Sequence, residues 1–438
     1  MLTRFEWART SAAERQSLLQ RPALGSDAYD VAKAILQDVS ERGDVAVRSY
    51  AERFDQWAPQ AGFRVSADEL ATAEQALDPE DRDAILAAAA AVRRFHAEQG
   101  YRAFSVETWP GVKAERRSTP IDVAGLYVPA GTAPLVSTLI MLAVPAQIAK
   151  VPRIAVIVPP RKGEGVEPSV LAAASLLGIS EVYAIGGAHG IAALGYGVAG
   201  LPKADKIFGP GNAYVAAAKA LLAQSPDGSS ADLPAGPSEV MVVADDEADA
   251  DLVALDLLSQ AEHDTLAQVV LVARSDGFVE RVEAAIERWL QVLPRGGTAR
   301  AALANSRAII TANEAEAVEA ADAYASEHLI VQTRDPRGLA DKVRHAGSIF
   351  LGPWTPEAAG DYAAGPNHSL PTAGAARAYG GVSVEMFQKT TTMLEIEKDG
   401  VGEIATCVER LAALEGLDAH RLAMKIRRER ASEQGVQL

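Results

Sequence analysis

The hydrophobic pattern divides the chain into a helical first part and two later series of short strands. Between residues 27 and 54, apolar residues recur every three or four positions, which predicts helices that cover or brace other elements. From residue 121 onward, short β-branched runs alternate with alanine-rich helical stretches, and this alternation predicts parallel βαβ units. The first series of predicted strands lies at residues 121–128, 153–160, 181–187 and 205–209.

A second series of predicted strands follows, so we expect a second sheet. Its runs are apolar almost throughout, as in parallel sheets that helices cover on both faces. Beyond residue 390 the strand pattern stops, and residues 403–416 and 419–431 read as helices of a small C-terminal unit. Because right-handed crossovers gather the loops after the strands at one edge, we expect the chemistry there. The second series lies at residues 239–245, 268–274, 307–313, 328–333 and 348–352.

Composition and charge narrow the classes of partner. Lys and Arg number 42 against 58 Asp and Glu, a net charge of −16, which repels nucleic acid and anionic membranes. Cys407 is the single cysteine, so the chain has no internal disulfide or multi-cysteine metal site, and a metal must use imidazole, carboxylate or amide ligands. The N-terminus lacks a signal-peptide pattern, and the apolar residues 139–149 are shorter than the roughly 20 residues that cross a bilayer. We expect a soluble cytoplasmic protein.

Two polar segments carry candidate site residues. In SQAEHD, Gln260 and His263 lie three residues apart at the end of a predicted helix, so both could reach one ion. The alternative is an ordinary polar helix terminus. Asp361, Asn367 and His368 occur in GDYAAGPNHSLPTAG, which is punctuated by glycine and proline and is predicted to be a loop beside a strand end. The alternative there is a surface turn.

Glu327 and His328 are a candidate acid–base pair at the start of a predicted strand. A base that titrates near neutrality beside a carboxylate suits proton transfer. Consecutive residues of a regular strand face opposite ways, so we predict an irregular strand start at residues 326–328 if both side chains reach one substrate. The alternative is an exposed glutamate beside a packed histidine.

The turn Gly209-Pro210-Gly211 closes a predicted strand, and Asn212 is a predicted N-cap of the next helix. Its backbone amides could receive a phosphate or a nicotinamide amide, although such a turn is more often structural. Residues 125–134 and 235–239 are further glycine–proline turns that border strands.

Taken together and in order, eight segments resemble the histidinol dehydrogenase family over residues 125–420. The individual motifs are short, and the ordered set is what carries the resemblance. The segments are GLYVPAGTAP, GGAHGIAAL, KIFGPGNAYV, LPAGPSEV, LLSQAEHD, SEHLIVQTRD, GDYAAGPNHSLPTAG and GLDAHRLA.

The resemblance implies an enzyme that oxidises L-histidinol through L-histidinaldehyde to L-histidine, with two NAD molecules used in succession and one zinc ion per site. It implies a homodimer with a shared active site. The implied zinc ligands are Gln260, His263, Asp361 and, from the partner subunit, His420.

The resemblance also implies roles for the other candidates. Glu327 and His328 match the catalytic acid–base residues. The implied NAD contacts are Tyr127, His189 and Asn212. The implied substrate contacts are Ser238, Gln260, His263, His328, Asp361, Glu415 and His420.

Three positions depart from the family pattern. His189 stands where the family usually has glutamine, Ser326 replaces a proline and Ala130 replaces a glycine. None of them removes a proposed ligand or base, so the departures bear on cofactor contacts rather than on the reaction.

With this resemblance we expect two Rossmann-like, doubly wound domains. The expected bounds are a helical arm at 1–23, a first domain at 24–126 and 238–382, a second at 127–237, and a helical dimerisation unit at 383–438. Three alternatives stay open: a family paralogue that oxidises another small alcohol, a zinc hydrolase, and a scaffold without catalytic activity.

Overall fold

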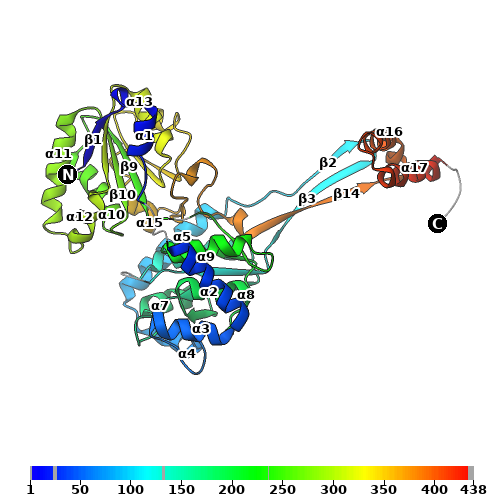
Figure 1. The fold of residues 1–438 in the computed structure, drawn as a ribbon, viewed down its shortest axis with the longest axis horizontal. Coiled ribbons are helices and arrows are strands. Elements are labelled where there is room, and N and C mark those ends of the chain that lie inside the picture. Colours follow the sequence, from blue (N-terminus) through cyan, green and yellow to red (C-terminus); the bar gives the residue numbers. More distant parts are fainter. Residues whose placement is uncertain (1, 23–26, 131–133, 235, 433–438) are drawn as a thin grey trace. The chain divides into compact units, whose positions relative to one another are not determined.

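The computed structural model describes residues 2–22, 27–130, 134–234 and 236–432. The chain divides into two compact units, one of residues 1–99 with 121–387 and one of residues 100–120 with 388–438. The first unit contains both predicted parallel sheets, which confirms the α/β class (Figure 1). Among the described residues, no helix is long and apolar enough to cross a membrane.

The first series of predicted strands forms a five-stranded parallel sheet in the order β6-β5-β4-β7-β8. Its central strands are buried because helices cover both faces, as their apolar sequences predicted. The strands are β4 (Val123–Tyr127), β5 (Arg153–Val158), β6 (Val182–Ala184), β7 (Lys206–Phe208) and β8 (Ser230–Ala231).

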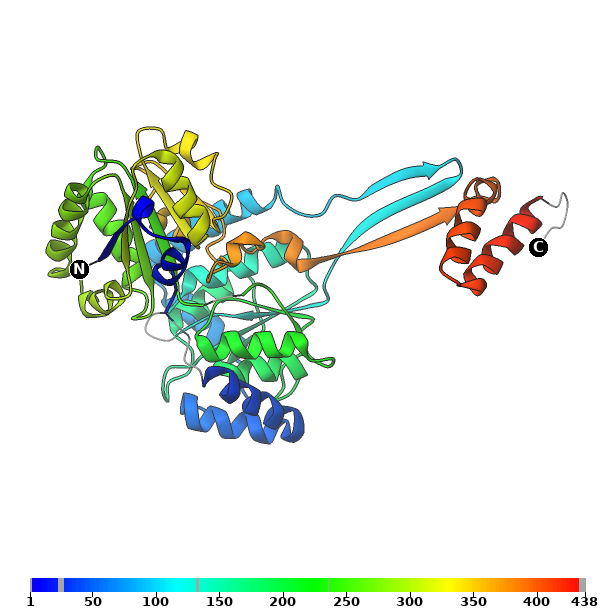
Figure 2. The ribbon, with the colours of Figure 1, turned by 45° about the horizontal axis from the view of Figure 1, so that its top comes forward.

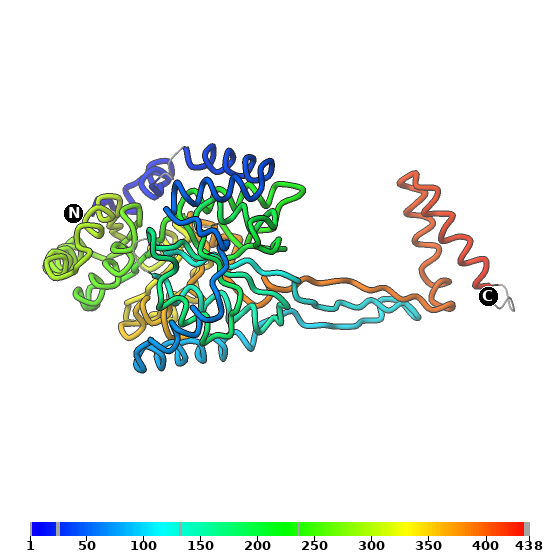
Figure 3. Tube along the Cα trace, turned by 90° about the horizontal axis from the view of Figure 1, so that it is seen from below, coloured from blue at the N-terminus to red at the C-terminus, as the bar shows by residue number. Residues whose placement is uncertain are grey.

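Two helical layers cover the two faces of this sheet. On one face, α4 packs on α7 and α5 packs on α6; on the other, α2 packs on α8 and α9, as Figure 3 shows for the blue and green helices. The helices and turns are α2 (Ala28–Arg42), α3 (Asp44–Tyr50), the π-helical η2 (Ala51–Asp55), α4 (Ala67–Ala76), α5 (Pro79–His96), α6 (Val136–Ile148), α7 (Pro168–Leu176), α8 (Gly187–Tyr196) and α9 (Ala213–Gln224).

The second series forms a six-stranded parallel sheet in the order β1-β11-β10-β9-β12-β13. Strand β9 lies in the interior, and the order of its neighbours is that of a doubly wound fold. The N-terminal strand β1 adds in parallel to the edge at β11. The strands are β1 (Thr3–Glu6), β9 (Glu239–Ala244), β10 (Gln268–Ala273), β11 (Arg307–Ile310), β12 (His328–Gln332) and β13 (Ser348–Leu351).

Helices again cover both faces, with α10, α11 and α12 on one face and α13 with the N-terminal arm on the other. Asn313 caps α13 by accepting a hydrogen bond from the backbone of Glu316. The elements of this half are η1 (Trp7–Arg9), α1 (Ala12–Leu18), α10 (Ala250–Ala261), α11 (Asp276–Leu290), α12 (Gly296–Leu303), α13 (Glu314–Tyr324), α14 (Pro336–Ala340), α15 (Glu357–Tyr362) and η3 (Ala375–Arg377). The short η4 (Val384–Phe387) packs on α6 of the other half.

The second unit combines a three-stranded antiparallel sheet, in the order β14-β3-β2, with two helices that pack on each other. Figure 2 shows its strands in cyan and orange and its helices in red. The elements are β2 (Phe104–Trp109), β3 (Val112–Pro120), β14 (Gln388–Ile396), α16 (Lys398–Leu414) and α17 (Asp418–Ser432).

The structure departs from the expected segment bounds in three places. Residues 24–126 were expected with the six-stranded sheet, but α2 packs on α8 and α9, and β4 belongs to the five-stranded sheet. The expected helical unit at 383–438 contains strand β14, which pairs with residues 112–120. The expected helical arm at 1–23 includes strand β1. All three departures depend on contacts between residues that are far apart in the sequence, and local periodicity does not encode such contacts.

Candidate functional site

A cavity of about 430 Å³ is lined by residues from both parallel sheets of the first unit. The five-stranded half contributes Pro129 after β4, Thr138 of α6 and the turn after β7. The six-stranded half contributes most of the side chains that the sequence singled out. They are Ser238, Gln260, His263, Glu327, His328, Asp361 and His368.

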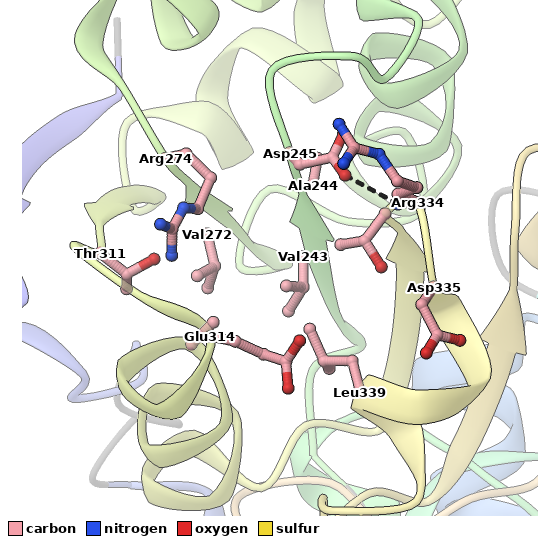
Figure 4. A pocket seen from close by; sticks show the side chains of 12 residues that line it. Val243, Ala244, Asp245, Val272, Arg274, Thr311, Glu314, Arg334, Asp335 and Leu339 are labelled. Carbon is pink, nitrogen blue, oxygen red and sulfur yellow. Dashed lines mark hydrogen bonds between the residues drawn. The ribbon is translucent and has the colours of Figure 1, made fainter.

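The cavity lies at opposite edges of the two sheets. It meets the carboxyl ends of β4 and β7, as expected, but it meets the amino ends of β9 and β12, since Ser238 and Glu327 directly precede those strands. The expectation that the chemistry follows the strands was therefore wrong for the six-stranded sheet. Its carboxyl edge holds a separate cavity of about 250 Å³, with Arg274 and Arg334 among its lining residues (Figure 4).

Glu327 and His328 both line the cavity because the chain bends before β12. Ala325 has a left-handed φ of 54°, a bend follows at Glu327, and His328 begins the strand. This confirms the predicted irregular start. The backbone N–H of Glu239 donates to Glu327 Oε2 at 2.9 Å, and the carbonyl of Glu239 lies 3.2 Å from His328 Nδ1.

Three carboxylates surround the His328 ring, which is 4% exposed. Nδ1 lies 3.6 Å from Glu357 Oε1 and 3.7 Å from Glu327 Oε2, and Nε2 lies 3.6 Å from Asp361 Oδ1. Burial acts to lower the pKa of His328, but the acidic neighbours outweigh it and raise this pKa to about 10. Burial raises the pKa of Glu327 to about 8. The acidic neighbours thus favour the protonated imidazole of His328, and burial favours the protonated carboxyl group of Glu327.

Three of the four residues predicted to bind zinc converge on this cavity. Gln260 at the end of α10, His263 one turn further and Asp361 near the end of α15 all line it. Gln260 Oε1 and Asp361 Oδ1 are buried without a hydrogen-bond partner, and burial lowers the pKa of His263, which favours the neutral imidazole. Two oxygens and an imidazole nitrogen are a donor set that zinc accepts, so these residues fit the metal.

A second set of possible ligands shares one member with the first. Ligand atoms of His328, Glu357 and Asp361 all lie within 4.8 Å of one another. Asp361 therefore belongs to both sets, and a metal at the second set would occupy the imidazole assigned to acid–base chemistry.

Two residues of the site are His368 and Glu357, to which neither the sequence pattern nor the resemblance gave a role. His368 Nε2 lies 3.2 Å from Thr138 Oγ1, and its Nδ1 lies 2.9 Å from the Asp361 carbonyl. Glu357 is 1% exposed, four residues before Asp361 on α15. That spacing places both carboxylates on one helical face and could have identified Glu357. The signal was missed because residues 360–374 were predicted to be loop throughout. That prediction was wrong at its start, since α15 extends to Tyr362.

The turn after β7 is held by a buried ion pair. Asp232 accepts a hydrogen bond from the Gly209 N–H at 2.7 Å, Lys219 donates to the Gly209 carbonyl at 2.7 Å, and the two side chains lie 2.5 Å apart. Asn212 accepts hydrogen bonds from the N–H groups of Tyr214 and Val215, which confirms it as the N-cap of α9. Asn212 lines the cavity.

The other two predicted NAD contacts do not line this cavity. Tyr127, at the end of β4, is buried, and this burial raises the pKa of its hydroxyl. His189 on α8 is 1% exposed, and its Nε2 lies 2.9 Å from Asp55 Oδ2. The imidazole that stands in place of glutamine is therefore engaged by a neighbouring carboxylate.

Glu415 and His420 belong to the second unit. They lie at the end of α16 and the start of α17, and both are exposed. Their part in the site depends on assembly, so it stays a prediction.

Comparisons with known proteins point to one family. The family model described as histidinol dehydrogenase matches residues 20–428. The chain is 44% identical to histidinol dehydrogenase of Escherichia coli (strain K12), over 99% of each chain. It is 46% identical to that of Xanthomonas euvesicatoria pv. vesicatoria, over 97% of this chain and 98% of the other. A crystal structure of histidinol dehydrogenase from Elizabethkingia anophelis matches with a TM-score of 0.93 and 38% identity, over 99% of each chain.

Proposed function

This chain belongs to the histidinol dehydrogenase family, and from that premise we propose that it oxidises L-histidinol through L-histidinaldehyde to L-histidine, using NAD and zinc. Membership makes it an oxidoreductase that acts on a small molecule. The observation that carries the finer proposal is the convergence of Gln260, His263 and Asp361 on the cavity that Glu327 and His328 line. A cytoplasmic location is part of the proposal, in keeping with a biosynthetic enzyme family.

Zinc would be held by Gln260, His263 and Asp361 together with His420 of the partner subunit. When bound, it would orient the imidazole and amine of the substrate, which is catalysis by positioning. We prefer this set to His328, Glu357 and Asp361 because it leaves the His328 ring available as a base. The negative charge of Asp361 contributes to the raised pKa of His328, so ligation of a dication by Asp361 would favour the neutral form of that imidazole.

The two acid–base residues act in succession. His328 takes the hydroxyl proton of histidinol as a hydride leaves carbon for NAD, which produces the aldehyde. Glu327 takes a proton from water, whose oxygen adds to the aldehyde carbon, and His328 returns its proton to the carbonyl oxygen, which completes the hydrate. The hydrate loses a second hydride to NAD and a proton to His328, and the resulting carboxylic acid releases its proton to solvent as the carboxylate. In sum, histidinol, water and two NAD⁺ give histidine, two NADH and three protons.

A homodimer with a shared site is also proposed. The second unit exposes large apolar side chains, which soluble monomers rarely gather in one small unit. Glu415 and His420 lie at its helical end, where a partner's cavity could receive them. The apolar side chains include Phe104, Val106, Trp109, Leu394, Leu411, Leu414, Leu417, Leu422 and Ile426.

The decisive experiment measures NADH absorbance with purified protein, zinc, NAD and histidinol. We expect two NADH for each histidine formed and no absorbance change without either substrate. Negligible turnover of histidinol together with turnover of another small alcohol would favour a family paralogue. Hydrolysis of model esters without NAD would favour a hydrolase. Bound zinc in Glu357→Gln but not in His263→Asn would support the preferred ligand set, and the reverse would contradict it.

A further inference from the structure

One residue touches both proposed acid–base side chains through its backbone. Glu239 begins β9, and its N–H donates to Glu327 Oε2 at 2.9 Å. Its carbonyl oxygen lies 3.2 Å from Nδ1 of His328, which pairs in register with Val240 across β9 and β12. A displacement of the start of β9 would therefore move the hydrogen-bond partners of Glu327 and His328 together.

The side chain of Glu239 is held in place by an arginine from the N-terminal arm. The Glu239 side chain is 3% exposed and that of Arg21 is 21% exposed. Arg21 Nε donates to Oε1 at 2.6 Å and Nη2 donates to Oε2 at 2.8 Å, which is a bidentate pair. The backbone N–H of Ala373 donates to Oε1 at 2.7 Å. A buried carboxylate with these three donors has little freedom to move.

Arg21 also holds the segment that leads to Glu327 and His328. Its Nη2 donates to the Tyr324 carbonyl at 2.7 Å, and its guanidinium lies 4.1 Å from the centre of the Tyr324 ring. Tyr324 ends α13, and Ala325 follows with the left-handed φ of 54° that turns the chain toward β12. One guanidinium thus ties the start of β9 to the turn before β12.

We propose that the Arg21–Glu239 pair is a positioning device for the acid–base site. Arg21 touches neither the cavity nor a proposed zinc ligand, and it acts through Glu239 and the Tyr324 carbonyl on the placement of Glu327 and His328. The proposal rests on the proposed function of those two side chains. Because a misplacement of about 1 Å can cost about 100-fold in rate, the loss of this pair has a measurable kinetic effect.

The test compares Arg21→Met with a matched control on the same arm. Arg15 lies 4.1 Å from the centre of the Trp7 ring, pairs with Glu319 at 3.0 Å and donates to the Trp7 carbonyl, and both of these partners lie outside β9 and β12. We expect Arg21→Met to lower kcat by about 10- to 100-fold, with the KM for NAD and the zinc content changed less than about twofold. Arg15→Met should change kcat by less than about twofold. Arg21→Lys keeps the charge but not the fork and should restore part of the rate.

A double-mutant cycle with Glu239→Gln isolates the pair. The combined variant should lose much less than the product of the two single losses, since both changes remove one interaction. If Arg21→Met does not fold, the kcat values of Arg21→Lys and Glu239→Gln are compared with that of Arg15→Met in its place. Equal kcat losses in the Arg21 and Arg15 variants, or multiplicative losses in the cycle, would overturn the proposal.

A crystal structure of the soluble Arg21 variant separates this inference from the proposed function. We expect the contact between the Glu239 N–H and Glu327 to lengthen or break, while the helices around the five-stranded sheet stay in place. An unchanged contact would refute the positioning role. A wild-type enzyme that fails to oxidise histidinol would count against the proposed function alone, because this structural result would still decide the inference.

Discussion

Replacement of Gly209 by alanine tests how tightly the turn beside the cavity is packed. Gly209 has a φ of +114°, and a Cβ there would lie 2.1 Å from the Tyr127 carbonyl oxygen and 3.0 Å from Leu142 Cδ1. The first contact is with backbone, so no side-chain rotation can relieve it. The turn must shift, and with it the Gly209 groups that Asp232 and Lys219 hold.

The loss of folding free energy in Gly209→Ala has two parts, and a control variant can separate them. A non-glycine residue at this φ costs about 1–3 kcal/mol of backbone strain. The overlap with Tyr127 adds about 2–3 kcal/mol, a typical cost of overpacking. Gly62 has a φ of +99°, and a Cβ there would meet nothing within 4 Å. Gly62→Ala therefore carries the backbone strain without the overlap.

Thermal unfolding followed by circular dichroism measures the difference. At about 2–4 °C per kcal/mol, Gly209→Ala should unfold roughly 4–12 °C below Gly62→Ala. The KM for NAD should rise in Gly209→Ala, because Asn212 lies on the same turn. Unfolding of the two variants within about 2 °C of each other would refute the reasoning about the overlap.

Three further predictions concern the reaction, the assembly and the pH dependence of stability. Glu327→Gln should slow the second oxidation by about 100-fold or more and the first far less, so that a trapping reagent detects aldehyde; equal losses in both steps would contradict the assigned role. His420→Ala and His263→Ala should each lose zinc and activity, and their mixture should regain part of both if subunits share ligands; no recovery would argue against sharing. Burial lowers the pKa of His96 in the folded chain. As the pH falls below about 6.5, the ordinary pKa of histidine, the unfolded chain takes up a proton more readily than the folded chain, so the free energy of unfolding decreases as the pH is lowered. The unfolding temperature should drop between pH 7.5 and 5.5, and His96→Gln should show a smaller drop; an equal drop would assign it to other groups.

Much of the fold could be predicted because it depends on local patterns. Runs such as IAVIV and VMVVA are apolar throughout, and each forms the buried part of a strand covered on both faces. Asn212 caps α9 through hydrogen bonds to residues two and three positions ahead, which depend only on neighbouring sequence. The bend before His328 followed from the alternation of side chains along a strand, which forbids a regular strand from presenting both members of the pair.

Long-range pairing lay outside those patterns. Strand β14 was missed because its largely polar sequence, QKTTTMLEI, is mostly exposed and becomes a strand by pairing with β3. Helix α2 has an apolar face that could cover either sheet, and its sequence pattern does not indicate which of the two sheets it covers.

For the candidate site, the sequence by itself named the side chains that we propose carry the chemistry. Gln260, His263, Glu327, His328 and Asp361 were all named from motif and spacing, and all line one cavity. The tertiary structure alone decided that the cavity meets the amino edge of the six-stranded sheet, that Glu357 lies against His328, and that Arg21 holds Glu239. The physical reason is that the chemistry of a side chain depends on the residue type alone. The packing of whole apolar surfaces decides which edges of two sheets meet, and it sets the distance between residues hundreds of positions apart.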